Sequence, residues 1–377
     1  MPANSPAPAP DAPRFDPVDD AIGAVARGEL VVVVDDDDRE NEGDLIMAAS
    51  KATPERVAFM IRHTSGILCT PLEEDLAKRL HLEPMVARND APLATAFTVS
   101  VDYREGLSTG ISAEERAATA VALSGGNVVA GDFVRPGHIF PLVGRRGGVL
   151  VRSGHTEAAI DLARAAGCAP VGLLAEVVND DGTVQRLPEL MRFAKEHDLK
   201  IISIADLIAW RQRREQLVVR TREFEVQTAI GRARALAYRT RFEDAEHLAL
   251  VFGDHGPGTS VPVRIHREKL IEDVFGPQAS HQSNLLQTAL QRLGELGGGV
   301  FIYLRSGFAG VPLDNLSEGP ASRADGRNRD WLEIGVGAQI VRDLGVTRIR
   351  IVTGREVDYV GLEGFGLAVD GIELLGS

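Results

Sequence analysis

One stretch near the start of the chain, residues 30–50, constrains the fold and the chemistry more than any other. It opens with residues 30–34, a short run of apolar and mostly β-branched side chains that predicts a buried strand, and four consecutive aspartates end that run. Gly43 permits a sharp backbone path before the apolar residues 45–47 begin a second strand. The sequence therefore predicts an acidic loop held between two rigid strands.

Two interpretations of this loop stay open at the level of sequence. A run of charges is usually a solvated turn. The order RENEGD over residues 39–44, however, combines an arginine that can bind phosphate with oxygen ligands of the kind that Mg²⁺ takes beside substrate oxygens. Arg39, Glu40 and Asp44 are therefore candidate site residues.

Length and charge narrow the class of protein. At 377 residues the chain exceeds the usual size of a single core, so two domains are expected. A net charge of −13 favours solubility and argues against a general binder of nucleic acid or of anionic membranes. We expect neither nucleic acid nor a membrane among the partners, although a local arginine cluster can still bind phosphate.

The sequence is typical of a cytoplasmic protein. Cys69 and Cys168 have no CxxC spacing and fit a reducing compartment, where they serve as small buried apolar residues. Residues 1–16 are rich in Pro and Ala, carry no secretory signal and are expected to be a disordered leader. Charges or glycines interrupt every apolar run well before the roughly 20 residues that a membrane helix needs.

Helix starts and stops divide the first part of the chain into alternating elements. Thr53 and Pro54 predict a helix that ends near His63. Ser112 and Glu115 form a predicted capping box for a helix over residues 114–123. Further helices are expected over residues 157–166, 187–197 and 205–216, and strands over residues 65–71, 95–101, 148–151, 171–178 and 200–204.

Two residues outside the acidic loop each have a structural and a functional interpretation. Thr109, beside Gly110, is either an ordinary turn hydroxyl or a site residue. His138 follows a predicted turn at Pro136 and Gly137 and is either a packed or capping residue or, because imidazole ionises near neutral pH, a proton-transfer group.

The segment RSGHT, residues 152–156, joins a predicted strand directly to a predicted helix. Such a turn exposes backbone N–H groups at the positive end of the helix dipole, and with Arg152, Ser153 and Thr156 it predicts a phosphate cradle. His155 can also give an imidazole nitrogen to a metal. A simple capped turn is the alternative.

Glu176 is a single carboxylate within the apolar strand predicted over residues 171–178. Burying a carboxylic acid costs free energy unless the group is paired, so Glu176 is either paired structurally or tuned for proton transfer. We favour proton transfer because several candidate partners precede it in the sequence.

Five motifs in one order, DDDDRENEGDL, STGIS, RPGHIFPL, RSGHTEAAIDL and AEVVNDDG, together resemble the 3,4-dihydroxy-2-butanone-4-phosphate synthases of riboflavin biosynthesis. The resemblance covers residues 17–212 and implies an α+β domain with a mixed sheet, working as a homodimer. It also implies that ribulose 5-phosphate is converted to L-3,4-dihydroxy-2-butanone 4-phosphate and formate with Mg²⁺ or Mn²⁺ as cofactor.

The resemblance assigns roles to individual residues. Glu40 and His155 would be metal ligands, and His138 and Glu176 match the family's two essential catalytic positions. The residues expected to hold substrate are Arg39, Glu40, Asp44, Thr109, Arg152, Ser153, Gly154, His155, Thr156 and Glu176.

Residues 217–377 show a second α/β pattern that resembles GTP cyclohydrolase II. The three zinc-binding cysteines of that family align with Lys269, Ser280 and Gln282, and the sequence has no cysteine after Cys168. The whole chain is thus predicted to be α/β, with an α+β synthase domain followed by an α/β cyclohydrolase II-like domain that holds no zinc.

Other cyclohydrolase positions also differ from the family pattern. A Glu-Gly-Arg loop aligns with GFA at residues 307–309, and an arginine expected beside Asp330 aligns with Leu332. A lysine near the end of the domain aligns with Asp358. We therefore expect no cyclohydrolase activity; the alternatives are a bifunctional enzyme that retains it and a non-catalytic protein that senses metabolites.

Overall fold

The computed structural model describes residues 14–36, 39–241, 245–256, 258–275, 285–305, 335–354 and 365–375. The chain divides into two compact units, Met1–Ile208 and Ala209–Ser377. Most of the expected leader, residues 1–13, lies outside the described residues. No helix within the described ranges has the length and apolar character needed to cross a membrane.

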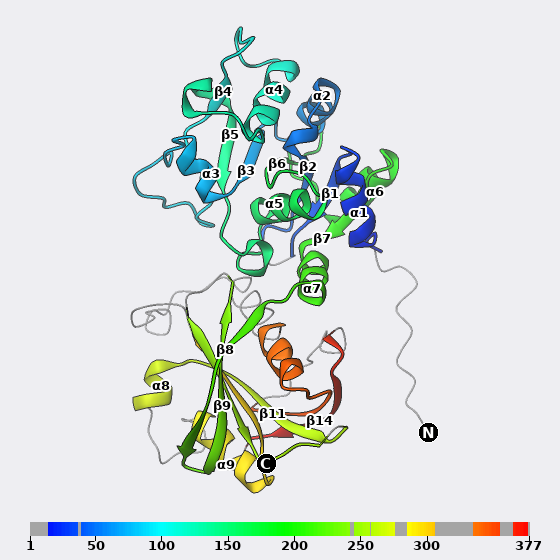
Figure 1. Cartoon of the computed structure of the whole chain (residues 1–377). Coiled ribbons are helices and arrows are strands. Elements are labelled where there is room, and N and C mark those ends of the chain that lie inside the picture. The colour runs from blue at the N-terminus through cyan, green and yellow to red at the C-terminus, as the bar shows by residue number, and fades with distance from the viewer. Residues whose placement is uncertain are drawn as a thin grey trace. The chain divides into compact units, whose positions relative to one another are not determined.

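A seven-stranded mixed sheet forms the centre of the first unit (Figure 1), in the order β4-β5-β3-β6-β2-β1-β7. The pairs β1–β7 and β3–β5 are parallel, and the other neighbouring pairs are antiparallel. The strands are β1 Val31–Val34, β2 Gly43–Ala48, β3 Cys69–Leu72, β4 Val101–Tyr103, β5 Phe133–Val143, β6 Gly172–Glu176 and β7 Lys200–Ser203. The expected mixed sheet is confirmed.

Helices cover both faces of this sheet. A Cβ atom on Gly172 would lie 2.5 Å from the Ala159 Cβ, so α5 packs closely against the face that carries Gly172. A Cβ atom on Gly43, which points to the opposite face, would lie 2.5 Å from Leu190 of α6. The helices of this unit are α1 Val18–Ala26, α2 Pro54–His63, α3 Glu74–Arg79, α4 Ala113–Leu123, α5 His155–Ala165 and α6 Leu187–Glu196. A further helix, α7 Ile204–Arg214, begins in the first unit and ends in the second.

The helix starts expected from the sequence are confirmed. The Thr53 hydroxyl accepts a hydrogen bond from the Arg56 N–H at 3.3 Å, and Ser112 forms the capping box with Glu115. Cys69 is buried in β3, as expected, whereas Cys168 is only half-buried.

Three expectations for local structure are wrong. Residues 148–150 form a 3₁₀ turn and not a strand, because Gly147 and Gly148 have φ values of 101° and 65°, which an extended strand excludes. Gly137 lies within strand β5, at a register irregularity where Val101 pairs with Ile139 but Asp102 pairs with Val134. A Cβ atom on Gly137 would lie 2.0 Å from the Val101 carbonyl carbon, so this glycine permits close approach of β4 and does not end the strand. Of the strand expected over residues 95–101, only Val101 belongs to a regular strand, β4.

A second seven-stranded sheet forms the centre of the second unit, in the order β14-β13-β11-β12-β10-β9-β8. Antiparallel pairing runs from β8 to β12, and parallel pairing from β12 to β14. The strands are β8 Val218–Thr228, β9 Gly231–Thr240, β10 Glu246–Phe252, β11 Ser260–Arg267, β12 Gly299–Leu304, β13 Arg348–Thr353 and β14 Ala368–Leu374; the helices are α8 Leu270–Phe275, α9 Leu285–Glu295 and residues 335–343.

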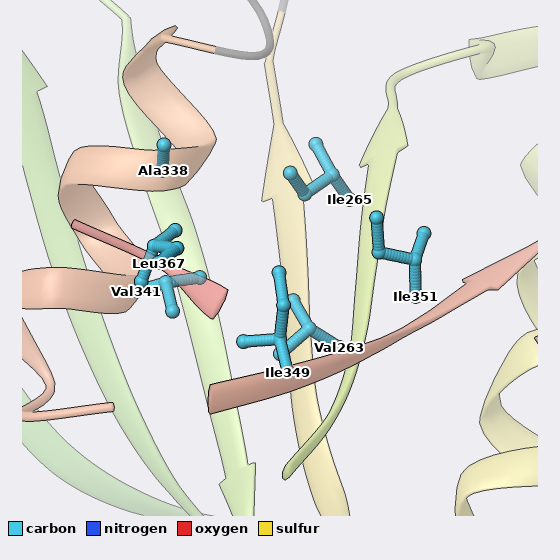
Figure 2. A pocket seen from close by; sticks show the side chains of 7 residues that line it. All are labelled: Val263, Ile265, Ala338, Val341, Ile349, Ile351 and Leu367. Carbon is cyan, nitrogen blue, oxygen red and sulfur yellow. The ribbon is translucent and has the colours of Figure 1, made fainter. Parts of the chain in front are cut away.

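A small cavity lies in the core of the second unit, between this sheet and the helix over residues 335–343 (Figure 2). Every side chain around it is apolar, so it offers a ligand no group for a hydrogen bond. We interpret it as part of the packed core. Its lining consists of Val263, Ile265, Ala338, Val341, Ile349, Ile351 and Leu367.

Candidate functional site

The acidic loop folds around one buried carboxylate, Asp35. Its oxygens accept hydrogen bonds from the Glu40 and Glu42 N–H groups at 3.0 and 2.9 Å. The Arg39 guanidinium donates to the same carboxylate at 2.8 Å, and the Arg39 and Asp35 side chains are only 7% and 1% exposed. Residues 39–42 are therefore held to the buried Asp35 and do not form the solvated turn that their charges alone suggest.

This loop meets the first residue of α5 to form a group of metal-ligand atoms. One ligand atom each of Asp35, Glu40 and His155 lies within 4.8 Å of the others. His155 Nε2 donates to the Val33 carbonyl at 3.1 Å, so Nδ1 is the nitrogen that faces the carboxylates. It lies 3.5 Å from Glu40 Oε2 and 3.7 Å from Asp44 Oδ1.

The ionisation of these groups is strongly coupled. Burial raises the pKa of Asp44 to about 8. Burial acts in the same sense on Glu40, but hydrogen bonding to His155 and the charge of Arg39 outweigh it and lower the pKa of Glu40 to about 2. Burial disfavours the imidazolium of His155, yet Asp44 and Glu40 together raise its pKa to about 9. A bound cation would therefore take the place of the proton on His155 Nδ1 and favour the ionised carboxylate of Asp44.

A divalent cation fits this donor set. Within the described part of the chain, Asp44 Oδ1 is buried and has no hydrogen-bond partner, which leaves an oxygen ready for a metal. Asp35 is already held by three hydrogen bonds and mainly fixes the loop. The predicted ligands Glu40 and His155 lie together. The structure adds Asp44, which the sequence analysis gave as a candidate site residue without assigning it to the metal, and Asp35, which it did not single out.

Two guanidinium groups meet at the start of α5. Gly154 is the N-cap of this helix, and a Cβ atom there would lie 2.4 Å from Arg152 Nη1 and 3.1 Å from Arg39 Nη2. Ser153 Oγ is buried without a hydrogen-bond partner among the described residues, and Thr156 is buried in the first turn. Positive charge and free helix N–H groups at one point are the elements of a phosphate site.

Arg152 is held in place by a buried carboxylate that the sequence analysis did not single out. Glu157 is 1% exposed and accepts a hydrogen bond from Arg152 at 2.7 Å and another from the Arg145 N–H at 2.9 Å. Because the guanidinium has five N–H donors, this pairing leaves others for an anion.

Glu176 lies beside Asp44 on the same face of the sheet. The two residues are directly paired between β6 and β2. The Ser65 hydroxyl donates to Glu176 Oε2 at 2.7 Å, and the carboxylate is half-buried. Glu176 is therefore paired and lies close to the metal-ligand group, and its role in proton transfer stays a prediction.

His138 lies at the same end of the sheet as Glu176. Cys69 of β3 pairs with Phe140 of β5 and with Leu174 of β6. His138 and Glu176 are each displaced by two residues from these partners, toward the start of β3, with β3 between them. Two strand spacings separate their backbones by roughly 10 Å.

His138 has a partner that sequence reasoning missed, Asp102. His138 Nδ1 lies 2.7 Å from Asp102 Oδ2, and the His138 N–H donates to Asp102 Oδ1 at 2.8 Å. A Cβ atom on Gly110 would lie 2.0 Å from Asp102 Oδ2, so the turn that carries Thr109 lies against this pair. A carboxylate at the end of the apolar alternation over residues 95–101 was the available signal.

The positions of the second unit that align with the functional residues of GTP cyclohydrolase II are described only in part. Lys269, aligned with a cyclohydrolase cysteine, pairs with Glu272 at 2.9 Å. The Lys269 N–H and His266 Nε2 each lie 2.9 Å from the Asp273 carboxylate. The remaining cyclohydrolase positions, Ser280, Gln282, 307–309, Asp330, Leu332 and Asp358, lie outside the described residues.

Two known protein families match the chain, one in each of its two units. Residues 19–210 match the family described as 3,4-dihydroxy-2-butanone 4-phosphate synthase. Residues 219–373 match the family described as GTP cyclohydrolase II.

Curated relatives align over nearly the whole chain. The riboflavin biosynthesis protein RibBA of Nocardia farcinica is 47% identical over 371 residues, which cover 94% of this chain and 89% of that protein. A chloroplastic protein of Arabidopsis thaliana, named monofunctional riboflavin biosynthesis protein RIBA 2, is 46% identical over 369 residues, covering 95% of this chain and 76% of its own.

Two solved structures resemble the fold. RibBX, a two-domain 3,4-dihydroxy-2-butanone 4-phosphate synthase from A. baumannii, has 34% identity and a TM-score of 0.80, covering 96% of this chain and 100% of its own. A 3,4-dihydroxy-2-butanone 4-phosphate synthase in complex with two magnesium ions has 42% identity and a TM-score of 0.52, covering 53% of this chain and 98% of its own.

Proposed function

Because the chain belongs to the 3,4-dihydroxy-2-butanone 4-phosphate synthase family, we propose that its first unit converts ribulose 5-phosphate into L-3,4-dihydroxy-2-butanone 4-phosphate and formate. The atoms of the sugar phosphate are divided between the two products, so the reaction needs no outside oxidant or reductant. The observation that carries the proposal is the group of Glu40, Asp44 and His155 at the start of α5, where two arginines meet.

Glu40 and His155, with Asp44, are the proposed ligands of a divalent cation. Carboxylate oxygens and one imidazole suit Mg²⁺ or Mn²⁺, and a related synthase is described as a complex with two magnesium ions. When bound, the cation polarises the ketose carbonyl and stabilises negative charge on the substrate oxygens. The Val33 carbonyl keeps the proton of His155 on Nε2, which leaves Nδ1 as the metal-binding nitrogen.

His138 and Glu176 are the proposed proton-transfer residues. A proton must leave the carbon beside the ketose carbonyl, and protons must be delivered and removed again as the carbon skeleton rearranges and formate departs. Ser65 holds the Glu176 carboxylate, and Asp102 holds the His138 imidazole.

The phosphate group of the substrate is proposed to bind at the start of α5. Arg39 and Arg152 approach Gly154 there, beside the Glu157 carboxylate, and the buried Ser153 and Thr156 flank Gly154 in the chain. Binding energy gained at the phosphate positions the reacting carbons, which lie several bonds away. Thr109, on the His138 side, is proposed to contact the other end of the sugar.

Formate release from ribulose 5-phosphate tests this function. The purified full chain with Mg²⁺ is expected to release formate, and Glu40→Gln is expected to lower the rate strongly because it removes a charged ligand. Exhaustive chelation is expected to abolish activity and added Mg²⁺ to restore it. Activity that survives chelation would contradict the metal assignment.

For the second unit, we propose a folded domain that neither binds structural zinc nor opens the ring of GTP. The support is Lys269 at an aligned cysteine position, the lack of any cysteine after Cys168, and similarity to a protein named as a two-domain synthase. A relative named monofunctional is 46% identical to this chain, and the relative named RibBA is 47% identical. The match of residues 219–373 to the GTP cyclohydrolase II family favours the alternative, a retained second activity.

Metal analysis and a GTP assay on the same full-length protein separate these possibilities. We expect no stoichiometric zinc and no formate from GTP, with Zn²⁺ or Mg²⁺ added, in samples that are active on ribulose 5-phosphate. Bound zinc together with formate from GTP would establish the bifunctional alternative.

Assembly and location complete the proposal. The synthase resemblance implies a homodimer, which light scattering coupled to size-exclusion chromatography measures directly. A cytoplasmic location stays a prediction from the sequence, and cell fractionation tests it.

A further inference from the structure

Arg186 connects the helix α6 to the acidic loop. It is the N-cap residue of α6, and its backbone N–H donates to Glu189 Oε2 at 2.9 Å, which fixes the start of the helix. Its side chain reaches back across the sequence, where Nη1 donates to the carbonyl oxygens of Glu40 at 2.6 Å and Asn41 at 2.5 Å. One guanidinium thus holds two consecutive carbonyls of the loop that carries a proposed metal ligand.

Other contacts hold other parts of this loop. Its inward N–H groups, those of Glu40 and Glu42, are bound by Asp35. Asn41 has a φ of 54°, in the left-handed region that asparagine adopts more readily than most other residues. The contact between Gly43 and Leu190 fixes the far end of the loop against α6. Arg186 therefore restrains the centre of the loop, where Glu40 lies.

We infer that Arg186 is a positioning residue that fixes the backbone of Glu40 and thereby sets the affinity of the first unit for its divalent cation. This inference rests on the proposed function, because it takes Glu40 as a ligand. Holding the Glu40 carbonyl orders its Cα and the direction in which its side chain leaves the loop. Hydrogen bonds from a charged donor are about twice as strong as neutral ones, so the restraint is substantial.

The contacts separate this role from a general contribution to folding. The Arg186 side chain is 44% exposed, so its removal opens no buried cavity. The helix α6 is held independently by Leu190, which is fully buried, and by Phe193, which is 7% exposed. Loss of Arg186 is therefore expected to loosen the loop while the sheet and α6 stay folded.

Binding of Mn²⁺ alone, followed by electron paramagnetic resonance on the full-length protein, tests the inference without turnover. Partners that orient metal ligands typically change metal affinity by about 10- to 100-fold. We expect Arg186→Ala to weaken Mn²⁺ binding at least about tenfold, and Arg186→Lys to fall between it and wild type, because one ammonium cannot match the planar guanidinium. Arg192→Ala, an exposed position on the same helix, is the matched control and should bind as wild type does.

Free guanidinium ion added to the variants provides a further test. It would not change the Mn²⁺ affinity if Arg186 had only a structural role. Low concentrations should restore part of the Mn²⁺ affinity of Arg186→Ala and leave that of Arg192→Ala unchanged. If Arg186→Ala and wild type bind Mn²⁺ with equal affinity while wild type releases formate, this inference is overturned and the proposed function stands. If wild type binds no Mn²⁺ and releases no formate, the proposed function fails as well. If Arg186→Ala does not fold, normal Mn²⁺ affinity in a folded Arg186→Met, which has no hydrogen-bond donor, overturns the inference.

Discussion

At the scale of single residues, the first unit gives each proposed reactive side chain a second residue that fixes its direction. Asp102 faces His138, Ser65 faces Glu176, and the Val33 carbonyl faces His155. The reactive groups therefore enter the reaction already oriented, which reduces the reorganisation that catalysis requires.

The proton-transfer residues give the first prediction. His138→Ala or Glu176→Gln should lower turnover at least about 100-fold, since general acid or base groups typically contribute about 10² to 10⁴ in rate. Formate release under saturating substrate measures the effect, and circular dichroism confirms that each variant is folded. A near-normal rate in either variant would return that residue to a structural role.

Asp102→Asn gives a second prediction. Asparagine keeps the size of the side chain but removes the charge that holds His138 Nδ1 at 2.7 Å. We expect kcat to fall at least about tenfold while KM changes little, because the imidazole loses its orientation and the phosphate site is untouched. A change confined to KM would place Asp102 in substrate binding instead.

At the scale of elements, the first turn of α5 combines two tasks. His155 begins the helix and faces the carboxylates of the acidic loop, and Gly154 caps it between Arg39 and Arg152. Because both tasks depend on one short turn, the position of α5 on the sheet sets the distance between the metal and the phosphate of the substrate.

Gly154→Ala tests this arrangement. The backbone there has φ −111° and ψ 159°, which alanine adopts without strain, so the variant should fold. Its Cβ would lie 2.4 Å from Arg152 Nη1 and displace the guanidinium. We expect KM for ribulose 5-phosphate to rise at least about tenfold. Gly126→Ala, where a Cβ meets open space, should leave KM unchanged, and an equal response of both variants would refute the role of Gly154.

At the scale of the whole molecule, each of the two units contains its own mixed seven-stranded sheet, but the two units bury different ionisable groups. Within the described residues, the one cluster of three metal-ligand side chains lies in the first unit. The second unit instead buries His247 on β10, where the imidazole Nδ1 accepts a hydrogen bond from the Arg305 N–H at 3.1 Å. That hydrogen bond requires an unprotonated Nδ1, so the second unit should be sensitive to acid.

The stability of the second unit should fall as pH falls from 7 to 5. Burial, helped by the charge of Arg305, lowers the pKa of His247 from 6.5 to about 4. Below pH 6.5 the unfolded chain binds a proton that the folded unit takes up only near pH 4, so the stabilisation present above pH 6.5 is lost on acidification. Linkage gives a loss of about 2 kcal/mol between pH 7 and 5.

Urea unfolding of the full chain with pulse proteolysis measures this for the second unit. His247→Asn keeps a hydrogen-bond acceptor but does not titrate, so its pH dependence should be smaller by about 2 kcal/mol. An identical pH dependence in wild type and variant would exclude His247 as the cause.

The sequence by itself determined the features that depend on neighbours in the chain. The strand before the acidic loop, the cap at Thr53 and the capping box at Ser112 are local, because a run of β-branched residues or a hydroxyl beside a free N–H acts within a few positions. The order of the motifs also indicated which residues belong to one site.

Only the tertiary structure decided which side chains meet. Asp102 lies 36 residues before His138, and Arg186 lies 146 residues after Glu40, so no local pattern joins either pair. The prediction of a strand over residues 148–151 is wrong for a related reason. The turn there depends on the positive φ of Gly147 and Gly148 and on a hydrogen bond from the Val149 N–H to Asp161 in α5. Strand register and helix packing set these contacts, and both are fixed by burial over the whole sheet rather than by any single segment.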